Sequence, residues 1–280
     1  MRRPAVVFVV LGFALAAFAA AQTNDSDLRK YLDGVTLRGW ELYDYDQAAW
    51  HGTDAFLALS PDSEGLAHYI CEKTPTGWMV VFPAWNSRHD RLLILYEGLE
   101  GVQRGKFEAR KVDPPRDATP EETAKEKALE LVIADFPRQE RPYNTAILPG
   151  PEGNLYVYLY PGQTKDSIWP IGGDARYTVL SDGTKILEKR QMHKTILDME
   201  YNPENHPAAG FHTHILSDVP EDTDVLYVLT RRPPIPEFIA ITPEKLFEVN
   251  PNGSIEMPKP CETAGPVPCK QIKNLEKFKK

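Results

Sequence analysis

Two of the chain's seven histidines, His212 and His214, stand one residue apart near the middle of the second half. Side chains alternate along an extended strand, so both imidazoles would project from the same face. Imidazole nitrogens bind zinc at about 2.0–2.1 Å, and a catalytic zinc ion takes a third protein ligand and keeps one position open. Asp224, at the start of an expected helix, can supply that third ligand. Zinc is therefore the candidate cofactor, and the residues suggest no other.

The third position has rivals, and the segment also has a structural interpretation. Asp218 and Asp222 precede Asp224 and compete with it, while His193 and His206 lie near enough in sequence to join the site. Alternatively, the two strand histidines would simply hydrogen-bond to neighbouring carboxylates, and Asp222 or Glu221 would cap the helix. The sequence leaves both interpretations open.

The segment resembles the core of the JAMM/MPN-type zinc metallopeptidase domains. The resemblance is carried by His-Thr-His on a strand, an acidic loop with Pro220, an aspartate entering a helix and two later strands, all within residues 175–250. In that family His-x-His is followed, after seven residues, by Ser-x-x-Asp, and a glutamate on an earlier strand is the general base. Here Asp224 falls one residue early, and Asp222 stands in the place of the serine.

The resemblance implies roles for particular residues. His212, His214 and Asp224 would hold the zinc ion, and Glu188, on an upstream hairpin, would be the catalytic general base. The metal would lower the pKa of a bound water and Glu188 would relay its proton, giving hydrolysis of a peptide or isopeptide bond. A broader likeness, from Asn154 through Arg190 to the His-Thr-His segment, is to uncharacterised exported bacterial proteins, and it implies location and shape but no activity.

The N-terminus has the three parts of a secretory signal peptide. A short basic start, Met1-Arg-Arg-Pro, precedes an apolar run over residues 5–21 that ends in small residues, so cleavage is expected before Gln22. The run is at the short limit for a bilayer span and ends in alanine rather than in a basic residue, so no stable span is expected after cleavage. These features predict a periplasmic or secreted protein.

The net charge indicates which kind of partner is disfavoured, and the cysteines indicate where a disulfide could form. The formal charge of −8 becomes −10 when Arg2 and Arg3 are removed with the signal peptide, and a surface that acidic disfavours nucleic acid. Cys261 and Cys269 flank a Pro/Gly-rich loop, which favours a disulfide in an oxidising compartment, and Cys71 would then be a buried thiol. The expected partner is an envelope protein or peptide that the sequence does not identify.

Hydrophobic periodicity predicts an α+β fold, with mainly antiparallel sheets and a few packed helices after the cleaved signal peptide. The expected first unit, 22–138, holds a helix capped by Asp46, a meander over residues 67–96, a strand at 106–112 and a helix with a capping box at Thr119. The expected second unit, 139–257, holds hairpins at 143–160 and 175–190, a strand at 208–216, a helix from 221 and strands at 238–241 and 245–249. Residues 1–21 form the signal peptide and 258–280 a tail.

Together these patterns predict an exported soluble protein that acts as a non-enzymatic binding or structural module of the cell envelope. The alternative is a zinc-dependent, JAMM-like hydrolase. The two differ in one requirement: the hydrolase needs His212, His214 and a carboxylate to converge on one point with a free coordination position.

Overall fold

The structure is a computed structural model that describes residues 8–137, 139–200, 207–242 and 244–260, with side chains from residue 25 onward. These residues form three α-helices, a 3-10 turn (η1, Pro151–Gly153) and thirteen strands. All strand pairs are antiparallel except one, so the predicted α+β class is confirmed.

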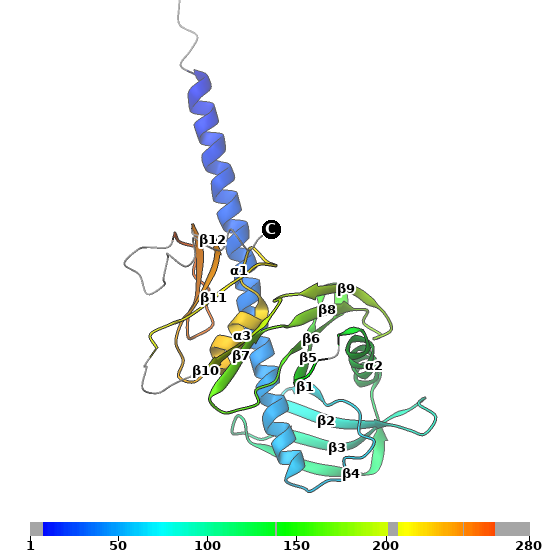
Figure 1. The fold of residues 1–280 in the computed structure, drawn as a ribbon. Helices are drawn as coiled ribbons and strands as arrows, with labels where there is room; N and C mark the ends of the chain where they lie inside the picture. Colours follow the sequence, from blue (N-terminus) through cyan, green and yellow to red (C-terminus); the bar gives the residue numbers. More distant parts are fainter. Residues whose placement is uncertain (1–7, 138, 201–206, 243, 261–280) are drawn as a thin grey trace, which may run out of the picture.

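A long helix, α1 (Phe8–Leu57), runs past every sheet of the molecule (Figure 1). The expected helix began at Asp46, and that boundary is wrong because the helix continues unbroken through Gly34 and Gly39. Its buried side chains recur at intervals of three, four or seven residues, which is the spacing that keeps one face of a helix against a core. Asp46 is therefore an interior helix residue rather than a cap.

The meander and its following strand and helix are confirmed; the first strand is shorter than expected and the other three are longer. Thr119 accepts a hydrogen bond from the Glu122 amide and Glu122 accepts one from the Thr119 amide, which is the predicted capping box. The sheet runs β1–β2–β3–β4 in order: β1 (Ile70–Thr74), β2 (Gly77–Trp85), β3 (Leu92–Glu100) and β4 (Phe107–Asp117), followed by α2 (Pro120–Asp135).

The described part of the second half contains three sheets, of four, three and two strands, and one short helix. Both predicted hairpins lie in a four-stranded sheet of order β5–β6–β8–β9: β5 (Tyr143–Pro149), β6 (Leu155–Pro161), β8 (Ala175–Val179) and β9 (Ile186–Gln191). The expected histidine strand is β11 (Gly210–Thr213), which pairs in parallel with β12 (Glu237–Thr242), and β12 pairs with β13 (Lys245–Val249). The predicted helix is α3 (Asp222–Thr230).

Two strands were not expected from the sequence: β7 (Ile168–Gly172) and β10 (Ile196–Glu200), which pair with each other. β7 contains a proline and ends in a glycine, both of which are depleted in strands, so its pattern does not indicate one.

Two hydrophobic cores meet at α3. The larger core draws on α1, the first sheet, α2 and the β5–β9 sheet, and it includes Leu226. The second core packs the earlier part of α1 against α3 and β12–β13, and it includes Val225. Buried residues of the larger core come from both sides of the expected boundary at residues 138–139, and that division stays a prediction.

The crossing of α1 and α3 depends on a missing side chain. A Cβ atom on Gly39 would lie 2.3 Å from Val225 Cβ and 2.9 Å from the Asp222 carbonyl oxygen. We therefore expect Gly39→Ala to lower the free energy of unfolding by about 1–3 kcal/mol, the usual cost of overpacking. Gly34→Ala is the control on the same helix, since its Cβ would meet only the end of the Arg38 side chain at 3.2 Å. Urea unfolding should show Gly34→Ala equal to or more stable than the parent, and a similar loss in both variants would contradict the helix-contact explanation.

Three other expectations can be placed. Cys71 is buried and has a free thiol, as predicted. Cys261 and Cys269 lie outside the described residues. No helix in the described part of the chain combines the length and the apolar character that a bilayer crossing needs, while signal cleavage and export stay predictions.

Candidate metal centre

His212 lies within β11, and His214 directly follows its last residue. The two imidazoles lie on the same side, as the alternation of strand side chains predicts. Their Nε2 atoms are 3.1 Å apart, and both side chains are buried. The parallel pairing of β11 with β12 places His212 opposite Ile239, next to Glu237 at the start of β12. The sheet thus fixes the two imidazoles as a pair.

Asp224 reaches the same point from the first turn of α3. Its carboxylate is fully buried and accepts a hydrogen bond from the Glu221 amide, with Oδ2 at 2.7 Å. Asp224 Oδ1 lies 3.2 Å from His212 Nε2, and Oδ2 lies 3.3 Å from His214 Nε2. Among the buried side-chain atoms, Asp224 Oδ1 has no hydrogen-bond partner. An atom of this kind has an unused lone pair that points into the cluster.

His193 completes the cluster from the loop after β9. Its Nε2 lies 2.9 Å from His214 Nε2 and 3.2 Å from Asp224 Oδ1. The donor atoms of His193, His212, His214 and Asp224 all lie within 4.8 Å of one another, and all four residues are buried. The four residues could hold a metal ion. They are called the His₃Asp cluster below.

Hydrogen bonds to the other ring nitrogens fix the orientation of each imidazole. The Nδ1 atoms lie 2.7 Å from an Asp174 oxygen for His193, 2.9 Å from a Glu237 oxygen for His212, and 3.0 Å from the Val219 carbonyl oxygen for His214. A carbonyl oxygen and ionised carboxylates only accept, so each Nδ1 carries the proton and donates. The Nε2 atoms of the neutral rings are then bare lone pairs that face one another. Three lone pairs in this arrangement require a proton or a cation between them.

The charges around the cluster leave room for a divalent cation. Asp174, Asp224 and Glu237 contact the imidazoles, and Arg231 is the one guanidinium in this set, with Nη1 2.8 Å from Glu237 Oε2. Three carboxylates and one guanidinium leave two negative charges when the imidazoles are neutral. A divalent cation would balance them.

The same charges shift the pKa values of the cluster. Burial alone lowers the pKa of His212, but the contacts with Asp224 and Glu237 outweigh it and raise the pKa to about 9. Burial also opposes charge on His193, and Asp174 and Asp224 outweigh it, so its pKa is well above the usual range. Burial raises the pKa of Asp224, yet the neighbouring histidines hold it well below the ordinary value. The cluster therefore attracts positive charge strongly.

Of the other candidate residues, those that the structure describes are not part of the His₃Asp cluster. Asp222, a rival ligand, is buried and pairs with Arg38 and Arg176 instead. Asp218 is exposed. Glu188, the expected general base, is exposed on β9, where its Oε2 accepts from the Thr178 hydroxyl at 3.4 Å, and it is not among the four clustered residues. His206 lies outside the described residues.

One side of the cluster borders a small cavity of about 160 Å³. His193 and His212 line it, together with apolar side chains that include Leu197, Ile215 and Leu216. Ile215 and Leu216 are 45% and 49% exposed, so this side of the cluster is the one that faces solvent.

Comparisons of the chain with protein families, with curated proteins and with solved structures find no match.

The Asp174 contact gives a prediction for metal affinity. Asp174→Asn keeps an acceptor for His193 but removes the charge that makes the imidazole a stronger ligand, so zinc affinity should fall roughly ten- to a hundred-fold. A competition titration against a chromogenic chelator would measure it. Asp198→Asn, which removes a 52%-exposed carboxylate paired with Arg141, is the control and should leave the affinity unchanged. Equal affinities for the two variants would show that Asp174 does not act through His193.

Proposed function

We propose that this protein is a zinc-binding module of the cell envelope without catalytic activity, in which the His₃Asp cluster holds the ion. The observation that carries the proposal is the convergence of three Nε2 lone pairs and one carboxylate, with every Nδ1 proton already committed to an acceptor. This arrangement supplies four nitrogen and oxygen donors, the number that a structural zinc site uses.

The distances support zinc as the metal. A tetrahedral zinc ion with bonds of about 2.0–2.1 Å holds its ligand atoms about 3.3 Å apart. Five contacts within the cluster, from 2.9 Å between His193 and His214 to 3.3 Å between His214 and Asp224, are close to that value, and all four donor atoms lie within 4.8 Å of one another. Three imidazoles also favour zinc and its transition-metal neighbours over magnesium or calcium, which prefer oxygen ligands.

Four protein donors support a binding or structural role over catalysis. A catalytic zinc ion keeps a position for water, and His193 takes the place that a three-ligand site would leave open. Asp174 and Glu237 are both engaged with histidines, and Glu188 is exposed and is not among the four clustered residues. None of these three carboxylates is placed to act as a general base.

A second candidate, a zinc-dependent hydrolase of peptide or isopeptide bonds, is favoured by one observation. The cavity beside His193 and His212 could admit water to a fifth position on the ion. In that case the metal would supply an activated water at neutral pH. The coordination number of the ion separates the two proposals: four protein ligands and no water support the first, and a bound water supports the second.

The test is elemental analysis of the mature protein, purified without a histidine tag. We expect close to one zinc per chain, and its loss in His212→Ala/His214→Ala. The matched control, His51→Ala/His89→Ala, removes two histidines from outside the cluster and should keep the metal. X-ray absorption at the zinc edge would then count nitrogen and oxygen neighbours. Absence of metal from the parent protein after zinc addition, or its retention in the first double variant, would overturn the zinc site.

A further inference from the structure

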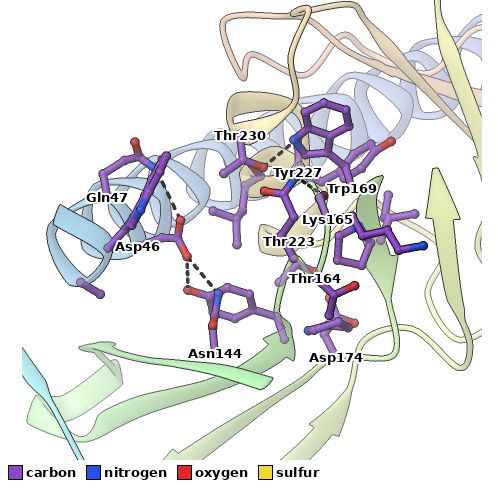
Figure 2. A pocket seen from close by; sticks show the side chains of 18 of the residues that line it. Asp46, Gln47, Asn144, Thr164, Lys165, Trp169, Asp174, Thr223, Tyr227 and Thr230 are labelled. Carbon is purple, nitrogen blue, oxygen red and sulfur yellow. Dashed lines mark hydrogen bonds between the residues drawn. The ribbon is translucent and has the colours of Figure 1, made fainter. Parts of the chain in front are cut away.

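A second cavity, of about 930 Å³, lies between α1, β7 and α3 (Figure 2). The four residues of the His₃Asp cluster do not line it. Its volume is within the range of about 300–1,000 Å³ that small-molecule sites occupy. The cavity is therefore large enough for a ligand that the metal centre does not need.

One wall carries a carboxylate without a cationic partner. Asp46 Oδ1 accepts from the Tyr160 hydroxyl at 2.9 Å and from the Asn144 amide at 3.5 Å, and Oδ2 accepts from the Gln47 amide at 3.4 Å (Figure 2). All three donors are neutral, and no ion pair within the described chain includes Asp46. Burial raises the pKa of Asp46, and these donors offset only part of that effect. A positive charge in the cavity would stabilise the carboxylate.

The opposite wall of the cavity has an unused hydrogen-bond acceptor, which suits a donor group on a ligand. Thr223 is 6% exposed, lines the cavity and has no hydrogen-bond partner for its hydroxyl oxygen (Figure 2). Asp174 also lines the cavity, and its Oδ1 is engaged by His193. Of the two cationic side chains in the lining, Arg232 donates to the Leu229 and Thr230 carbonyl oxygens, and Lys165 is exposed. The cavity therefore has an excess of acceptors and of negative charge.

Aromatic rings provide the rest of the site. Trp169 and Tyr227 line the cavity on the side away from Asp46, and Trp50, which is 58% exposed, lines it from the same helix as Asp46. Aromatic faces bind apolar groups and attract cations. We propose that this cavity binds an organic amine, with its ammonium group on Asp46 and its carbon skeleton against Trp50 and Trp169.

The test uses a pair of probes that differ in one group. Calorimetric titration of the full-length mature protein with phenethylamine and with 2-phenylethanol compares an ammonium with a hydroxyl on the same skeleton, and spermidine adds an amine without a ring. We expect at least one amine to bind and the alcohol to bind at least ten-fold more weakly. Because this comparison uses the parent protein, it does not depend on whether any variant folds.

A variant pair then locates the ammonium group. Asp46→Asn keeps the shape of the side chain and should weaken amine binding at least ten-fold. Asp54→Asn is the matched control, because Asp54 is an exposed aspartate of the same helix that also lines the cavity, and it should change binding little. Three results would each overturn the proposal: no amine binding at millimolar concentration, equal binding of the alcohol, or equal effects of the two substitutions. Binding of a neutral trisaccharide such as maltotriose without amine binding would identify a polyol site instead.

Discussion

Removing zinc with a chelator should lower the melting temperature of the mature protein by roughly 8–16 °C. A ligand present at 1,000 times its dissociation constant stabilises the folded state by about 4 kcal/mol, and each kcal/mol corresponds to about 2–4 °C for a chain of this size. The effect should be large because the His₃Asp cluster joins the loop after β9, β11 and α3. Without a cation, its lone pairs repel one another or must take up protons.

Thermal scans with and without dipicolinate would measure this loss, and added zinc should reverse it. Magnesium should not, because it prefers oxygen ligands in octahedral geometry. The His212→Ala/His214→Ala variant is the control for direct effects of the chelator on the protein. An equal decrease in that variant would mean that the chelator acts elsewhere.

Asp222→Ala should destabilise the fold by about 3–5 kcal/mol, the cost of breaking a buried ion pair from one side. The Asp222 side chain is 1% exposed and contacts Arg38 of α1 at 2.9 Å, Arg176 of β8 at 2.6 Å and the Tyr158 hydroxyl of β6 at 2.8 Å. Alanine would leave two largely buried guanidinium groups without their counter-charge. Urea unfolding, with zinc content measured in parallel, would give the size of the loss.

Two variants calibrate this result. Asp222→Asn keeps one acceptor oxygen and the shape of the side chain but replaces the other oxygen with an NH2 group and removes the charge, so it should cost less than alanine. Asp218→Ala removes an exposed carboxylate four residues earlier and should change the free energy of unfolding by less than about 0.5 kcal/mol. If Asp222→Ala were as stable as Asp218→Ala, the three contacts would contribute nothing net.

Local patterns were sufficient to predict most of the elements and three of the four residues of the cluster. His212 and His214 follow from strand alternation, and Asp224 from its place at the start of an expected helix. His193 was a candidate only through its proximity in sequence, since it lies in a loop where no periodicity constrains its direction. Asp174 and Glu237 gave no signal, because a carboxylate that orients a histidine is chosen by tertiary pairing: β11 with β12 for Glu237, and the end of β9 with the start of β8 for Asp174.

The start of the long helix shows the limit of local patterns. The expected helix began at Asp46, whereas α1 continues through Gly34 and Gly39. At Gly39 a glycine is required by the close approach of α3, a contact between residues 186 positions apart that no local window contains. Glu188 illustrates the converse case, since its assignment came from a family likeness alone and the structure places it on an exposed strand face.

The first turn of α3 makes the two halves of the molecule mechanically interdependent. Asp222 and Asp224 lie within that turn, yet one is anchored to α1 and β8 and the other faces the His₃Asp cluster, while the next two residues, Val225 and Leu226, belong to different cores. Because this nine-residue helix takes part in all of these contacts, it cannot unfold locally without breaking them. Amide hydrogens in α1, the β8 strand and β11 should therefore exchange through one shared opening, as a single cooperative unit.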